Sequence, residues 1–252
     1  MFGNAANSRT FSRRSLHGQV AHEIAMRIVT GELAPGASMP TEEAASAEMK
    51  VSRTAYREAL KVLSAKGLVE SRPKTGTRVR SRDQWNMLDP DLLSWSFAAG
   101  PTAKFARSLF EVRQIFEPAA AALAAERASE EELASIENAL SEMKGCDPES
   151  RDAIHADLAF HLRILAASGN ELLVSLGYLI ESALAQSFEL STHRPGAREN
   201  SIPLHEAVLV EIRARRPEGA RKAMNHLLSE AWADIASLLG EQRDRAPVRS
   251  VS

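Results

Sequence analysis

The chain has 252 residues, a formal net charge of −2 and 44% hydrophobic residues, enough apolar material to form ordinary cores in water. Its single cysteine, Cys146, excludes a disulfide framework and a thiolate metal cluster. No apolar run approaches the ~20 residues of a membrane-spanning helix, and no apolar segment follows the polar N-terminus, so we expect a cytoplasmic protein with no membrane partner.

The small net charge conceals a basic N-terminal third and an acidic remainder. Residues 1–82 contain 14 Lys and Arg against 7 Asp and Glu, whereas residues 83–252 contain 17 against 26. A basic segment is the electrostatic signature of a module that binds phosphates, so we expect the first third of the chain to bind nucleic acid. The asymmetry also favours two domains.

The basic segment predicts three helices. The first spans about residues 16–30, where apolar side chains recur at helical spacing. The second is short and begins after Thr41, whose hydroxyl can cap it, with two acidic residues in its first turn. The third begins after Ser52, which can also cap a helix. Its apolar face consists of Tyr56, Ala59, Leu60 and Leu63.

The third helix carries two arginines that suit a DNA major groove. Arg53 and Arg57 lie four residues apart near the start of the helix, so they share the face opposite the apolar stripe. A recognition helix needs long hydrogen-bond donors at this position. Surface arginines are often only solvated charges, but that alternative does not account for the ordered series of helices and hairpin in a net-positive segment.

After the third helix the pattern changes to two short extended runs, at about 68–71 and 77–80. A Pro-Lys-Thr-Gly segment between them favours a hairpin turn. A hairpin behind a recognition helix is a wing, and Lys74, Thr75 and Gly76 at its tip are placed to reach the DNA backbone or minor groove. The basic segment is therefore expected to be a winged helix-turn-helix.

These residues resemble the GntR-type winged helix. The similarity covers about residues 16–80 and is carried by the segments 39–42, 51–60, 66–69 and 76–79. It implies that residues of the third helix and of the wing tip contact DNA, namely Ser52, Arg53, Thr54, Arg57, Lys74, Thr75 and Gly76. Some members of that family have a DNA-contacting arginine early in the second helix, where this chain has Glu43.

The acidic remainder predicts helices throughout. Asp89 and Pro90 are typical of the cap and first residue of a short helix, which Gly100-Pro101 ends. Six longer helices follow, at about residues 103–127, 129–143, 149–168, 170–190, 199–215 and 217–240. Short connections favour antiparallel neighbours. We therefore expect a mainly α protein whose C-terminal part is an all-α antiparallel helical bundle.

Polar side chains interrupt the apolar stripes of this predicted bundle. Asp157 and His161 lie one turn apart on the third of the six helices, while His205 and His226 accompany the stripes of the fifth and sixth. Buried carboxylate and imidazole groups are costly unless they are paired or bind a metal. One carboxylate and three imidazoles suit Zn²⁺, with Ni²⁺ or Mn²⁺ as alternatives. For any one of these histidines, a hydrogen-bonded core residue is the competing interpretation.

Arg113 interrupts the apolar stripe of the first long helix in the same way. Glu117 lies four residues further on, so a simple ion pair between the two is one interpretation.

The acidic part also resembles a known domain. Its sequence at 110–118, 157–161 and 168–170 is similar to the FCD domain, the helical effector domain of the FadR-type branch of GntR regulators. The resemblance covers about residues 89–240. It implies metal ligands at Asp157, His161, His205 and His226, and a carboxylate effector bound by Arg113. A shorter stretch, 84–91, is similar to regulators of sugar acids such as D-galactonate.

Together these patterns predict a transcriptional regulator rather than an enzyme. We expect a homodimer that binds an inverted-repeat operator in double-stranded DNA and represses until a small carboxylate metabolite binds beside the metal. Two alternatives stay open: a metal with a purely structural role, and an Asp/His₃ metalloenzyme that activates water. The expected organisation is a disordered basic arm at 1–15, the DNA-binding domain at 16–80, a linker at 81–88, the effector domain at 89–240 and a disordered tail at 241–252.

Overall fold

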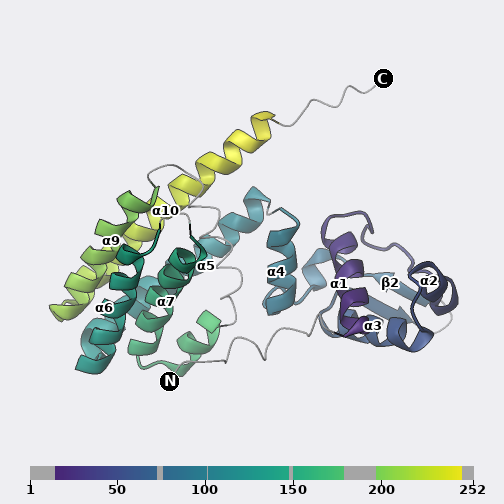
Figure 1. The fold of residues 1–252 in the computed structure, drawn as a ribbon, viewed down its shortest axis with the longest axis horizontal. Helices are drawn as coiled ribbons and strands as arrows, with labels where there is room; N and C mark the ends of the chain where they lie inside the picture. Colours follow the sequence, from purple (N-terminus) through teal and green to yellow (C-terminus); the bar gives the residue numbers. More distant parts are fainter. Residues whose placement is uncertain (1–14, 73–75, 101, 148–149, 179–196, 246–252) are drawn as a thin grey trace. The chain divides into compact units, whose positions relative to one another are not determined.

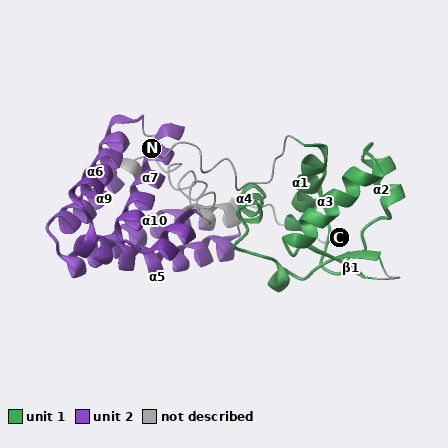
Figure 2. Ribbon diagram, turned by 90° about the horizontal axis from the view of Figure 1, so that it is seen from below, with its two compact units in different colours: residues 1–101 green, residues 102–252 purple. Residues whose placement is uncertain are grey.

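The computed structural model describes residues 15–72, 76–100, 102–147, 150–178 and 197–245 (Figure 1). The chain divides into two compact units, Met1–Pro101 and Thr102–Ser252 (Figure 2). None of the described helices is both long and apolar enough to cross a membrane.

The first unit contains the predicted three helices and hairpin. Its elements are α1 (Leu16–Val29), α2 (Glu42–Glu48), α3 (Arg53–Ala65), β1 (Val69–Arg72) and β2 (Gly76–Val79). Each helix begins where a hydroxyl caps it: Ser15, Thr41 and Ser52 accept hydrogen bonds from the backbone N–H three residues on. These caps satisfy N–H groups that have no partner inside the helix, which is why the sequence predicts the starts of α2 and α3 correctly.

The wing is a two-stranded antiparallel sheet. Val69 pairs with Val79 at its base, where both are buried, and Arg72 pairs with Gly76 at its outer end. Gly76 has a φ of 78°, a left-handed conformation that glycine adopts without steric cost. Lys74 and Thr75 lie outside the described residues.

The segment predicted as a linker, 81–88, packs into the first unit. Trp85 is 8% exposed, and its indole N–H donates a hydrogen bond to the carbonyl of Arg80. The backbone N–H of Asn86 donates to the carbonyl of Lys66. A Cβ at Gly67 would lie 2.6 Å from the carbonyl oxygen of Gln84, so this close approach requires glycine.

The next helix, α4 (Pro90–Ala98), also belongs to the first unit. It starts at the predicted cap, Asp89, and buries Leu92 and Trp95 in the same core as α1 and α3. The sequence predicts this helix as the start of the effector domain, whereas the division between the compact units falls after Pro101.

A buried ion-pair cluster joins α4 to the end of α3. Lys66, the C-terminal cap of α3, is 7% exposed. Its Nζ lies 2.8 Å from Oδ1 of Asp89 and 2.6 Å from Oδ2 of Asp91. It also lies 5.5 Å from the centroid of the Trp95 ring. A lysine removed from water in this way is tolerated because two carboxylates and an aromatic face surround it.

The second unit is all helical in its described part. Its elements are α5 (Ala103–Arg127), α6 (Glu130–Gly145), α7 (Arg151–Ala167), a helical segment at 171–178, α9 (Ala197–Arg213) and α10 (Pro217–Arg245). The first helix matches its predicted range, and Ser129 and Glu132 form a capping box at the start of α6. Alanines of α5, including Ala121 and Ala124, are fully buried, which lets α7, α9 and α10 pack closely around it (Figure 1).

One boundary in this unit needs correction. The sequence predicts a disordered tail from residue 241, whereas α10 continues through Gly240 to Arg245. Glycine inside a helix costs only about 1 kcal/mol relative to alanine, and the Glu-Gln-Arg-Asp-Arg that follows consists mostly of good helix formers. The basic arm at 1–14, the end of the tail at 246–252 and most of the fourth predicted bundle helix, at 179–190, lie outside the described residues.

Candidate metal centre and nucleic-acid interface

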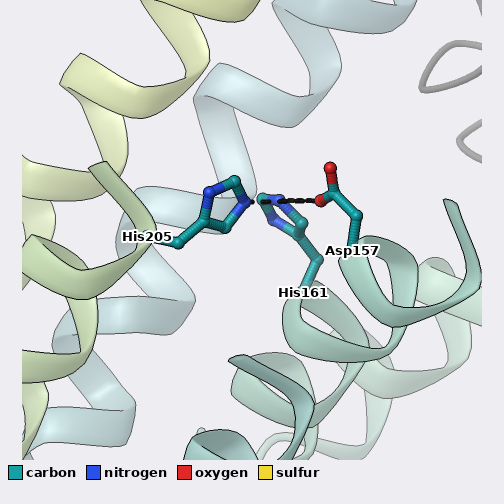
Figure 3. A group of neighbouring side chains, drawn as sticks. All are labelled: Asp157, His161 and His205. Carbon is teal, nitrogen blue, oxygen red and sulfur yellow. Dashed lines mark ion pairs between the residues drawn. The ribbon is translucent and has the colours of Figure 1, made fainter. Parts of the chain in front are cut away.

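Three polar side chains from two helices converge inside the second unit (Figure 3). Asp157 and His161 are one turn apart on α7, so both project from one face of that helix. His205 projects from α9. Oδ1 of Asp157 lies 3.3 Å from Nε2 of each histidine, and both imidazoles are at most 3% exposed.

Hydrogen bonds on the far side of each imidazole determine which nitrogen faces the aspartate. Nδ1 of His161 lies 2.6 Å from a carboxylate oxygen of Glu117, and Nδ1 of His205 lies 2.8 Å from the carbonyl of Ser201. Both neighbours are acceptors, so each Nδ1 carries a proton and donates it. In the neutral rings, Nε2 then turns its lone pair toward Asp157.

This arrangement leaves acceptors facing acceptors. Oδ1 of Asp157 and Nε2 of His205 are both buried, and neither makes a hydrogen bond of acceptable geometry to a residue that the structure describes. Lone pairs 3.3 Å apart in a buried site repel one another unless a cation lies between them or a proton neutralises one of them.

The donor set fits a transition-metal ion. Ligand atoms at about 2.0–2.1 Å from a tetrahedral zinc ion are about 3.3–3.4 Å apart, which matches the two oxygen–nitrogen separations of 3.3 Å. Two imidazole nitrogens and one carboxylate oxygen also suit Ni²⁺. Three protein ligands leave at least one coordination position for another molecule.

The fourth predicted ligand, His226, is not part of this group. Its side chain is 62% exposed, and the nearest carboxylate oxygen, on Glu230, lies 3.9 Å from its Nδ1. The buried stripe of α10 includes Met224 and Leu228. His226 is two residues from Met224, which is about 200° around a helix, so its side chain leaves from the outer side.

Arg113 and Glu117 extend the site along α5. Nε of Arg113 donates to Oε1 of Glu117 at 2.7 Å, while the other carboxylate oxygen accepts the hydrogen bond from His161. Both α5 side chains are at most 2% exposed. The ion pair considered from the sequence is therefore present. It uses one of the five N–H donors of the guanidinium, so it does not exclude a contact between Arg113 and an effector.

The charges of this cluster shift its titration strongly. Burial would raise the pKa of Glu117, but Arg113 and His161 outweigh it and hold that pKa at about 2. Burial would likewise lower the pKa of His161, but Glu117 and Asp157 raise it above its ordinary value. The two histidines hold the pKa of Asp157 well below its usual range. From the sequence, Glu117 is predicted only as a partner of Arg113. Its position on the apolar stripe of α5 is the signal that could have predicted its burial.

The predicted DNA-contacting residues of α3 form an exposed surface. Ser52, Arg53, Thr54 and Arg57 are all exposed, and the hydroxyl of Ser52 also caps the helix. Gly76 is exposed at the outer end of the wing.

Both arginines of α3 contact carboxylates of α2. Nη2 of Arg53 lies 2.6 Å from Oε1 of Glu43, and Arg57 binds both oxygens of Glu42, at 2.6 Å for the closest pair. Arg57 holds the pKa of Glu42 below its ordinary value. Ion pairs this exposed are weak in water, so DNA can displace them.

Comparison with known proteins identifies both units. Residues 16–79 match the model of bacterial regulatory proteins of the gntR family, and residues 108–230 match the FCD domain. The chain belongs to the GntR family. This GntR protein is 33% identical to the HTH-type transcriptional regulator YieP of Escherichia coli (strain K12), over 86% of its own length and 94% of the relative. It is also 33% identical to the galactonate operon transcriptional repressor of the same organism, over 78% and 86% of the two chains.

The fold of this GntR protein is also found in a solved structure of the Listeria monocytogenes regulator Lar. The TM-score is 0.63 at 22% identity, over 90% of this chain and all of that one. The family and its relatives are transcriptional regulators and not enzymes, so this protein is a DNA-binding transcriptional regulator. The metalloenzyme considered from the sequence is set aside.

Proposed function

We propose that this regulator binds a divalent metal ion, most favourably Zn²⁺, through Asp157, His161 and His205. The observation that carries the proposal is the convergence of two histidine lone pairs on one carboxylate oxygen at 3.3 Å inside the protein. Ni²⁺ and Mn²⁺ are the competing ions. Without His226, the three-residue set leaves room for a ligand from solution.

The ligand we propose is a small carboxylate metabolite. A bound metal ion supplies positive charge that attracts a carboxylate oxygen. Arg113 adds a second cationic donor, held in place by Glu117, whose other oxygen orients a ligand histidine. A related chain is named as the repressor of the galactonate operon, so sugar acids and hydroxy acids are the first compounds to test.

On DNA, we propose that a homodimer places one α3 helix in each half of an inverted repeat. Arg53 and Arg57 are the candidates for guanine O6 and N7, while Ser52, Thr54 and the wing-tip residues 74–76 contact the backbone or minor groove. The relatives named as repressors favour repression that the metabolite relieves. The metabolite acts only through a difference in its affinity for the DNA-binding and non-binding arrangements.

A thermal-shift screen of metal-loaded protein against carboxylates tests the effector site. A ligand at 100 times its Kd stabilises the protein by about 2.7 kcal/mol. We expect a hit that disappears on chelation and in Arg113→Met but persists in Arg107→Met, which changes an exposed arginine of the same helix. If no acid stabilises the protein and chelation unfolds the domain, the metal is structural, which was the alternative from the sequence.

A further inference from the structure

The first turn of α2 holds its two arginine partners in different ways. Glu42 uses both carboxylate oxygens on Arg57. Glu43 uses only Oε1, on Nη2 of Arg53, and no hydrogen bond to its Oε2 occurs within the described ranges. The side chain of Glu43 is 76% exposed, against 37% for Glu42. Glu43 therefore presents an unused acceptor directly beside the unused donors of Arg53.

A carboxylate at this place restricts what DNA the protein can accept. DNA phosphates repel the carboxylate. Base edges that offer only acceptors, such as guanine N7 and O6, cannot donate to it, so the carboxylate would lose its hydrating water without gaining a hydrogen bond. The major groove offers two base donors, cytosine N4 and adenine N6. Glutamate pairs with cytosine N4, and arginine pairs with the O6 and N7 of guanine.

We propose that Glu43 is a specificity-determining residue: as Arg53 donates to a guanine, Glu43 accepts a hydrogen bond from N4 of a neighbouring cytosine. Helix α2 then reads the operator together with α3, and the pair selects a G and a C side by side. This inference rests on the proposed function in placing Arg53 in the major groove. Glu42 is the weaker candidate for this role, because in the structure without DNA Arg57 binds both of its oxygens and its side chain is less exposed.

The test is selection of binding sites from a random duplex library with the full-length protein, followed by affinity measurements on the selected site and its single-base variants. The variants are Glu43→Ala, Arg53→Ala and, as a control, Glu48→Ala. Glu48 is exposed at the end of the same helix, so its replacement removes the same charge away from Arg53. Thermal unfolding of each variant confirms that the surface changes leave the fold intact.

We expect the unaltered protein to prefer cytosine at one position beside a guanine, by about 5- to 150-fold over the other bases. In Glu43→Ala the ratio of affinities for cytosine and for the other bases falls to nearly one, while the preference for guanine remains. Glu48→Ala should select the same site as the unaltered protein. If Glu43→Ala selects an unchanged site, or binds all sequences more tightly by one common factor, Glu43 reads no base and the inference is overturned. If Arg53→Ala also leaves the site unchanged, the placement of Arg53 in the groove fails as well.

Discussion

Glu117 and His161 lie on different helices, with 2.6 Å between Oε2 of the glutamate and Nδ1 of the histidine. Glu117 thus fixes the tautomer of His161, a proposed metal ligand, without belonging to the proposed ligand set. Carboxylates that accept from the second nitrogen of a metal-binding histidine orient the ring and raise its basicity. Because Oε1 of the same carboxylate holds Arg113, the proposed effector contact and the proposed metal contact share one residue.

Glu117→Gln is expected to weaken metal binding by about 10- to 100-fold. Arg113 and His161 both donate to Glu117, and an amide offers only one acceptor oxygen, so one donor must face the amide N–H₂. Competition with a chelating dye measures the affinity. Glu111→Gln, an exposed change on the same helix, is the control and should leave it unaltered. Equal affinities for metal in Glu117→Gln and Glu111→Gln would show that Glu117 does not support His161 as a metal ligand.

The affinity for metal is expected to rise with pH across the neutral range. Burial lowers the pKa of His161, but Glu117 and Asp157 outweigh it, so the net pKa in the metal-free protein lies above the ordinary value. The proton on His161 stabilises the metal-free fold below its ordinary pKa, and this contribution is lost as the pH rises through the raised pKa. A metal must displace that proton, so it binds more tightly once the proton has left. Titrations at a series of pH values test this, and a pH-independent Kd would contradict it.

Lys66→Met is expected to lower the free energy of unfolding by about 3–5 kcal/mol, because it leaves the buried Asp91 and the partly buried Asp89 without their cation. Lys61→Met is the matched control. Lys61 pairs with Glu58 on the surface of α3, so its replacement should leave the free energy of unfolding nearly unchanged. Urea unfolding followed by circular dichroism measures both, and similar losses in the two variants would count against the buried cluster.

Tyr56→Phe is expected to keep or raise stability, by up to about 1–3 kcal/mol. Tyr56 is fully buried, its hydroxyl has no hydrogen-bond partner among the described residues, and burial raises its pKa. The same position tests packing: Tyr56→Ala should cost about 3–5 kcal/mol through the cavity that it leaves. Thermal unfolding measures the stability of both variants. A Tyr56→Phe variant less stable than the unaltered protein would reveal a hydrogen bond to the hydroxyl.

Local chemistry made much of the fold predictable. Thr41, Ser52 and Asp89 cap the helices that they were expected to cap, because capping depends on a few neighbouring residues. The i, i+4 spacing of Asp157 and His161 likewise requires only that α7 be a helix.

What the sequence could not show depends on contacts between distant segments. The second role of Glu117 needs α7 beside α5, and the place of α4 depends on a lysine 23 residues away from Asp89. His226 shows a different limit. It borders an apolar stripe, and side chains at such a border can turn either inward or outward, so the sequence pattern did not decide its orientation.

The burial of Lys66 against α4 bears on where the first unit ends. Residues 81–98 are held to the end of α3 by the backbone bond from Asn86 to Lys66 and by the ion pairs of Lys66 with Asp89 and Asp91. The packed core that holds α3 therefore extends through α4, and its stability depends in part on one lysine and two carboxylates.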